Sequence, residues 1–280
     1  MTTLEARALR RILVALDASR SSLEALRAAA ALAARMGAEL ECLFIEDVNL
    51  VRLGQLPVAR QVTLTGGAAG PLEPLNLEAE LRAMAARARE AVAAAAAPFR
   101  LSWSFRVARG QVSGELLTAA VGADLLVVGR AGYAVPRGRG PGRVARAAAA
   151  RAPVSVLVLI GDIQPGRPVL AVFDGSPGSE RALSLAARLE GAGAGSLTVL
   201  LAAPTREAAG RLADQAAQLL GGAAAPAGRW IGGGRLSDVV RAVQEPDALL
   251  VVGADSPTLG GEAGLERLLD EVACPVLLAR

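Results

Sequence analysis

Short runs of consecutive apolar residues alternate along this chain with segments whose apolar residues recur every three or four positions. The first run, ILVAL at residues 12–16, precedes a helical pattern in which Leu26, Ala30 and Ala33 share one side. Strands that are apolar throughout, rather than at every second residue, are typical of a parallel sheet covered on both faces by helices. The pattern therefore predicts a doubly wound α/β fold.

The same alternation continues to the end of the chain. Strands are expected within residues 12–16, 42–45, 102–108, 124–129 and 154–159, and again within 169–173, 197–202, 229–233, 249–253 and 275–279. Helices are expected after Ser19 and Ser176 and over residues 77–92, 111–122, 143–152, 205–220, 236–245 and 262–273. Each half is thus expected to hold a five-stranded parallel sheet with helices on both faces.

The second half of the sequence repeats the first. The motif D-x-S-x-x-S-x-x-A-L follows a strand at Asp17 and again at Asp174, and the strand ending at Gly129 matches the one ending at Gly253. Such a repeat predicts two tandem domains, residues 1–160 and 166–280, which we call the first and second halves. Residues 49–76 have no counterpart, and a mobile loop, a lid over the site and a partner-contacting flap stay open as their role.

Composition excludes several classes of function. The chain has no histidine, which removes Ser-His-Asp and Cys-His catalysis and histidine-ligated metals. Cys42 and Cys274 show no CxxC spacing and are expected to be buried thiols. The serines of the repeated motif, such as Ser19 and Ser176, have no base to activate them, so we expect helix caps and no enzyme, with slow hydrolysis of a bound ligand left open.

Charge and hydropathy indicate which kinds of partner and which location to expect. With 30 basic and 27 acidic residues the net charge is only +3, and aromatic residues make up 2% of the chain, so we do not expect nucleic-acid binding. No apolar run is long enough to span a bilayer, and the run before Asp17 is too short for the core of a signal peptide. We therefore expect a cytoplasmic protein that is not a membrane protein.

A glycine-rich loop after residues 124–129 carries the candidate chemistry. Its spacing is Gly129-x2-Gly132-x9-Gly142, and a helix is expected to start near Arg143. Glycines let backbone amides converge on an anion, and a helix N-terminus adds unpaired donors, so the loop is a candidate phosphate site. A flexible connector uses the same residue type and stays open as the alternative. Because ligands bind where the strand order of an open sheet reverses, we expect Asp17 to lie beside this loop.

These motifs together resemble the universal stress protein family in its tandem two-domain form. In nucleotide-binding members the fourth strand runs into G-x2-G-x9-G-[S/T]-V, and Gly129, Gly132, Gly142 and Val144 fall on that pattern. The resemblance implies that ATP or another adenine nucleotide binds there, with Mg²⁺ if it is a triphosphate, and that Asp17 lies near the nucleoside.

One position of the motif departs from the family. Arg143 replaces the Ser/Thr, so its guanidinium either takes over the phosphate contact or fills the space, while Arg130 adds positive charge. A nucleotide-free dimerisation or protein-docking module is therefore the alternative function.

The second half keeps the motif less well. Ser256 stands where the second glycine should be, Gly264 aligns with Gly142 by counting back from Pro275, and nearby carboxylates such as Asp255 repel phosphate. We expect this half to be a structural partner. The resemblance also implies that the last strands of the two halves pair, which would make an intrachain pseudo-dimer; a homodimer of two chains stays open.

Overall fold

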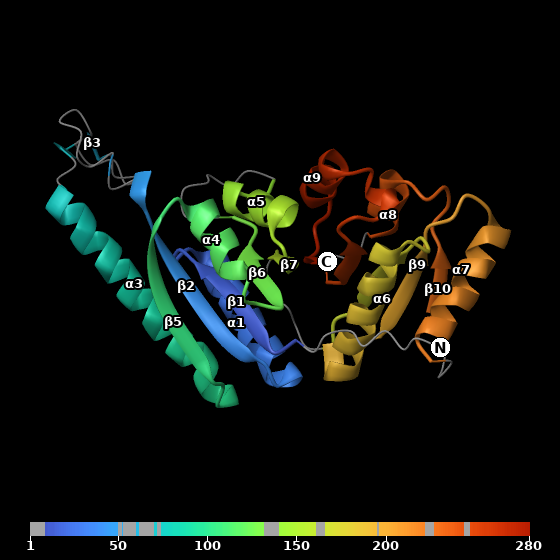
Figure 1. The fold of residues 1–280 in the computed structure, drawn as a ribbon, viewed down its shortest axis with the longest axis horizontal. Helices are drawn as coiled ribbons and strands as arrows, with labels where there is room; N and C mark the ends of the chain where they lie inside the picture. The colour runs from blue at the N-terminus through green and yellow to red at the C-terminus, as the bar shows by residue number, and fades with distance from the viewer. Residues whose placement is uncertain are drawn as a thin grey trace.

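Strands and helices alternate through the first half of the chain (Figure 1). The structure is a computed structural model and describes residues 9–49, 52, 60–61, 70–71, 74–131, 140–160, 166–194, 196–221, 227–243 and 247–280. The strands of the first half are β1 (Arg11–Leu16), β2 (Glu39–Asp47), β5 (Trp103–Gly110), β6 (Leu125–Gly129) and β7 (Ser155–Leu159). Its helices are α1 (Arg20–Met36), α3 (Pro74–Ala96), η1 (Ala97–Phe99), α4 (Val112–Ala120) and α5 (Arg143–Arg151).

The second half repeats this arrangement with shorter elements. Its strands are β8 (Val169–Phe173), β9 (Leu197–Leu201), β10 (Ala227–Trp230), β11 (Leu249–Gly253) and β12 (Val276–Ala279). Its helices are α6 (Pro177–Leu189), η2 (Glu190–Ala194), α7 (Arg206–Leu219), α8 (Leu236–Ala242), η3 (Pro257–Leu259) and α9 (Glu262–Glu271).

The strands of both halves join in one ten-stranded sheet, in the order β10-β9-β8-β11-β12-β7-β6-β1-β2-β5. Neighbours within each half are parallel, whereas β12 and β7 pair antiparallel, with Leu277 opposite Leu157. The tandem α/β fold is therefore confirmed, and the two halves form one continuous sheet. We call the β7–β12 pairing, with the helices beside it, the seam.

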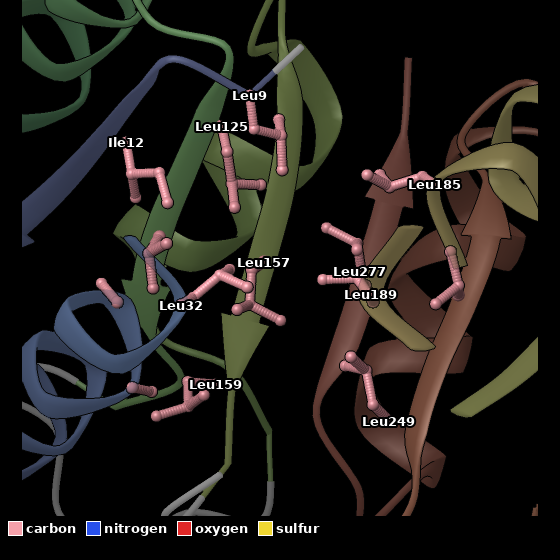
Figure 2. Close-up of a cluster of buried hydrophobic side chains, with 14 of the residues drawn as sticks. Leu9, Ile12, Leu32, Leu125, Leu157, Leu159, Leu185, Leu189, Leu249 and Leu277 are labelled. Atoms are coloured by element: carbon pink, nitrogen blue, oxygen red, sulfur yellow. The ribbon is translucent and has the colours of Figure 1, made fainter. Parts of the chain in front are cut away.

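The central strands are buried on both faces, as their uninterrupted apolar sequences predict. Every residue of β7, β8, β11 and β12 is buried, whereas all four residues of the edge strand β10 are exposed. Helices α1, α3, α6 and α7 pack on one face of the sheet, and α4, α5, α8 and α9 pack on the other. The apolar layer under α1 and α6 continues across the seam, where Leu32, Leu157 and Leu277 lie together (Figure 2).

Two predicted helix caps are present. Ser19 and Ser176 precede α1 and α6 in extended conformation, and their side chains accept from the amides of Ser22 and Ser179. This satisfies one of the amides that a helix start leaves unpaired. Of the insertion at 49–76, the structure describes a short antiparallel pair, β3 (Arg60–Gln61) and β4 (Gly70–Pro71); the expected loop, lid or flap otherwise lies outside the described residues.

Candidate functional site

The strand order of the first half reverses between β1 and β6. β1 lies between β2 and β6 and is parallel to both, while α1 and α5 lie on opposite faces. Ligand sites of open α/β sheets lie outside the carboxyl ends of strands at such a point. Asp17 directly follows β1 and Gly129 ends β6, so the fold brings these two predicted residues to one edge, which we call the first switch point.

A tight turn fixes Asp17 at the end of β1. Its carboxylate accepts the amide of Ser19 at 3.0 Å, and its own amide donates to the hydroxyl of Ser22 at 3.4 Å. The intervening Ala18 has φ of 58°, which places it in the left-handed region that a non-glycine residue seldom adopts. The equivalent position in the second half is Gly175, whose φ is 80°. The start of α1 therefore holds Asp17 in place on the carboxyl edge of the sheet.

Gly129 allows α1 to pack directly against the end of β6. A Cβ at this position would lie 2.5 Å from the hydroxyl oxygen of Ser21 and 2.7 Å from its carbonyl oxygen. The same hydroxyl accepts the amide of Ala131 at 3.3 Å. The first glycine of the predicted phosphate loop is therefore needed for close helix–strand packing, whatever else it does.

The structure places the side chain of Arg130 in the seam. Its guanidinium donates to the carbonyl oxygens of Val272 at 3.2 Å and Asp270 at 3.3 Å, at the C-terminus of α9. Cations are favourable there because the last carbonyls of a helix carry partial negative charge. Burial lowers the pKa of this guanidinium. The sequence predicts that Arg130 adds positive charge to the nucleotide loop; in the structure its guanidinium joins the two halves.

The far end of the loop returns to its start. The amide of Gly142 donates to the carbonyl oxygen of Arg130 at 2.6 Å, so this amide is already used and does not point to a ligand. Gly142 is the N-cap of α5 and offers no side-chain acceptor to the first turn. Arg143, the first residue of α5, is exposed, and Val144 packs against the core. Gly132, the remaining predicted residue, lies outside the described residues.

Two further arginines that the sequence did not single out hold the seam. Arg146 on α5 donates to the carboxylate of Asp270 at 2.8 Å, across 124 residues of chain. Arg280 donates to the carbonyl oxygen of Ala149, near the C-terminus of α5, and to that of Val154 at 3.4 Å. Arg130 and Arg280 thus each bind the C-terminal end of a helix of the other half. No local pattern marks these residues, because each partner is more than a hundred residues away.

The equivalent edge of the second half, outside β8 and β11, is filled by its own loop. Asp174, the counterpart of Asp17, accepts the hydroxyls of Ser176 and Ser256, both at 2.5 Å, and that of Thr258 at 2.8 Å. Burial alone would raise the pKa of Asp174, but the hydrogen bonds from these three residues outweigh it and hold the pKa well below its usual range. We call this place the second switch point.

The acidic residues of this half are partly neutralised. Asp255 forms an ion pair with Arg181 on α6 at 2.7 Å, and Glu266 lies 3.9 Å from Arg146. The sequence predicts that carboxylates repel phosphate here. The structure shows in addition that η3 places Ser256 and Thr258, both buried, on Asp174.

The alignment of Gly264 with Gly142 is wrong in structural terms. The N-cap of α9 is Gly261, and Gly264 lies inside the first turn of the helix. A Cβ there would overlap the carbonyl oxygen of Leu259, so this glycine permits close packing of η3 on α9. Counting residues back from Pro275 gave the wrong alignment because α9 and the connection that follows it are both longer than α5 and the connection before β7.

The described residues contain no group of three or more histidine, cysteine or acidic side chains placed to hold a metal ion. Both cysteines are buried and free, as expected, and desolvation raises the pKa of Cys42 to about 12 and that of Cys274 to about 11. Within the described residues, no helix is long and apolar enough to cross a membrane.

The strand order defines a tandem α/β protein with a mostly parallel sheet, whose order reverses at the first switch point. The profile of the universal stress protein family matches residues 8–159. The chain belongs to the universal stress protein family.

Solved structures share this architecture over nearly the whole chain. A universal stress protein from Archaeoglobus fulgidus DSM 4304 aligns over 96% of this chain and 96% of its own, with 15% identity and a TM-score of 0.69. A functionally unknown protein from Pseudomonas aeruginosa PAO1 aligns over 98% of this chain and 93% of its own, with 17% identity and a TM-score of 0.55. These similarities show the tandem fold. None of the curated proteins compared with this chain matches it.

Proposed function

We propose that the first half binds an adenine nucleotide, ATP first among them, at the first switch point, and that the second half is its structural partner. The observation that supports this most is the charge at the start of two equivalent helices. The first turn of α5 has Arg143 and no acidic residue, whereas that of α9 has Glu262. The amides and dipole of a helix N-terminus attract anions, so α5 favours a phosphate and α9 disfavours one.

Each residue of the site has a role in this proposal. Asp17 accepts hydrogen bonds from the nucleoside, and the amides of Arg143 and Val144 donate to phosphate. Gly142 contributes space rather than a donor, because its amide is bonded to the carbonyl of Arg130. The Arg143 side chain is exposed, which leaves it able to reach the outer phosphates in place of the missing hydroxyl. If the ligand is a triphosphate, Mg²⁺ accompanies it and offsets part of its charge.

The proposed activity is binding in the cytoplasm, with no turnover beyond slow hydrolysis. The hydroxyl of Ser22 donates to the carbonyl of Ser19 at 3.0 Å, and the Ser19 hydroxyl accepts the amide of Ser22 at 3.2 Å. The hydroxyls of Ser19 and Ser22, both within five residues of Asp17, are thus part of a helix cap. The chain also has no histidine to activate a nucleophile.

Isothermal titration calorimetry with ATP, ADP and AMP tests the proposal. Wild-type protein should bind at least one of them, and Arg143→Glu should weaken binding about tenfold or more, because a hydrogen bond to a charged group is worth about 1.5–3 kcal/mol and about 1.4 kcal/mol is tenfold. Arg143→Ser, which restores the family's hydroxyl, should keep the affinity within about fivefold.

Arg151→Glu is the matched control. Arg151 is exposed at the other end of α5, so this change alters the net charge equally but lies one helix length away from the phosphate. It should leave nucleotide affinity unchanged. Absence of heat with every nucleotide, from protein shown to be folded by circular dichroism, would overturn the proposal, as would equal losses in Arg143→Glu and Arg151→Glu.

A docking module that works without nucleotide is the second candidate, and the edge strand β5 favours it. β5 ends the sheet order and pairs only with β2 among the described residues, and its Val107 is 46% exposed. An open strand edge can accept a strand from another chain. If no nucleotide binds, sedimentation velocity should show an oligomer that Val107→Glu dissociates; a monomer at every concentration would remove dimerisation through this edge.

A further inference from the structure

A small cavity lies at the seam, on the face of the sheet that α1 and α6 cover. Two pairs of equivalent leucines from the two halves line it, Leu32 with Leu189 and Leu157 with Leu277 (Figure 2). The cavity therefore lies near the approximate twofold axis that relates the halves. It lies on the face of the sheet opposite to α5, the helix that follows the glycine-rich loop in sequence. None of the roles proposed above uses it.

Two arginines complete this otherwise apolar lining. The side chain of Arg167, in the segment before β8, is only 7% exposed, and Arg35 lies near the C-terminus of α1. The Nε and Nη1 atoms of Arg167 and the Nε of Arg35 are buried and have no hydrogen-bond partner among the described residues. Burial also lowers the pKa of Arg35. Among the described residues, three guanidinium nitrogens at one cavity thus have no acceptor.

In the part of the chain that the structure describes, nearby protein charge does little to balance Arg167. Its one ionic contact there runs from Nη2 to the carboxylate of Asp247 at 3.5 Å, and the Asp247 side chain is 88% exposed. Such a long contact to a solvated carboxylate is worth little. A buried charge without a partner is strongly unfavourable, and the leucines that line the cavity offer no acceptor.

Size and chemistry select the kind of ligand. The cavity volume is about 20 Å³, which is room for one water-sized atom or a little more. A water molecule fits and accepts hydrogen bonds, but it does not neutralise charge. A small monovalent anion does both. Phosphate, nucleotides and alkyl carboxylates are larger than this space.

We propose that the seam cavity binds a small monovalent anion of the size of chloride, held jointly by Arg35 of the first half and Arg167 of the second. The anion accepts hydrogen bonds from their unpaired nitrogens and joins α1 to the start of the second half. The site is independent of the nucleotide site, and its consequence is a dependence of the stability of the whole chain on anions.

Crystals grown or soaked in sodium bromide test the site directly. Bromide resembles chloride and scatters anomalously, so a peak in the anomalous map is expected between the guanidinium groups of Arg35 and Arg167. Density for a water molecule without anomalous signal, or a guanidinium paired with another protein group, would overturn the proposal. This experiment uses the wild-type chain and does not depend on any variant folding.

Thermal unfolding distinguishes specific binding of the anion from the other outcome, an adventitious ion only. At constant ionic strength, replacing gluconate, which is too large for the cavity, with chloride should raise Tm by about 2–6 °C. In Arg167→Met and Arg35→Met the chloride dependence should disappear, while stability in gluconate should not fall by much, because methionine suits an apolar lining.

Arg27→Met is the matched control, since Arg27 is an exposed arginine on the same helix as Arg35. It should keep the full chloride dependence. A Tm that does not respond to chloride in the wild type, or a response that all three variants share, would show an adventitious ion only and would overturn the proposal.

Discussion

The hydroxyl of Ser256 donates to the carboxylate of Asp174 at 2.5 Å, across 82 residues of chain. Ser256 aligns in sequence with Gly132 of the first half, and a glycine has no side chain that could do the same. The serine at this position of the repeat thus places a hydroxyl of the protein at the edge of the sheet where the first half is proposed to hold a ligand. The hydroxyl of Thr258 adds a second such contact.

Asp174→Asn should destabilise the chain in a pH-dependent way. The folded pKa of Asp174 is depressed, so its contribution to the free energy of unfolding is fully present above the unfolded value of about 4 and is lost as pH falls towards the folded value. We expect a loss of about 2–3 kcal/mol at neutral pH that shrinks at about pH 3. Urea unfolding of wild type and variant at both pH values measures the difference.

Asp214→Asn makes the same chemical change at an exposed position on α7 and should alter stability little at either pH. A constant difference between wild type and Asp174→Asn from neutral pH to about pH 3 would contradict the assignment of the effect to the Asp174 charge.

Gly129→Ala should destabilise the first half. The new Cβ would lie 2.5 Å from the hydroxyl oxygen and 2.7 Å from the carbonyl oxygen of Ser21, so backbone must move, which costs about 1–3 kcal/mol. Gly114→Ala is the control, because Gly114 is an exposed residue inside α4 with nothing within 4 Å of its Cβ position. It should stabilise by about 0.5–1 kcal/mol. Chemical denaturation that gives both variants the same sign would contradict this explanation.

Much of the fold could be predicted because it depends on local pattern. Uninterrupted apolar runs marked the central strands, and the repeated D-x-S-x-x-S motif marked the two caps at Ser19 and Ser176. The adjacency of Asp17 and Gly129 followed from the rule that open sheets reverse their order at the ligand site, and the pairing of β1 with β6 confirms it.

The rest depends on contacts between the halves, which local pattern does not contain. Nothing in the loop of the first half indicates that Arg130 binds the carbonyls of α9 rather than a ligand. In the same way, the contact between Ser256 and Asp174 depends on η3, which holds the Ser256 hydroxyl against a carboxylate 82 residues away in the chain. The sequence could identify the residue types of the site but not which of them the seam uses.

Both cysteines should be unreactive in the folded protein. Cys42 and Cys274 are 0% and 1% exposed, and burial raises their thiol pKa values to about 12 and about 11. The thiolate is the reactive form, so very little of it is present at neutral pH. Titration with Ellman's reagent should detect almost no thiol in buffer and both thiols in guanidinium chloride. Rapid reaction of either thiol in buffer would show that its part of the core opens.

Arg130→Met should weaken the seam without affecting nucleotide binding. The variant loses two hydrogen bonds from a charged group to the C-terminus of α9, which we expect to cost about 1–3 kcal/mol in the free energy of unfolding. Urea denaturation measures this cost, and calorimetry with ATP should give the wild-type affinity. Arg151→Met, an exposed arginine of α5, should change neither quantity by much. If instead Arg130→Met kept full stability and lost about tenfold or more in affinity for ATP, Arg130 would face the phosphates. In that case Arg146 and Arg280, and not Arg130, would hold α5 and α9 to the opposite half.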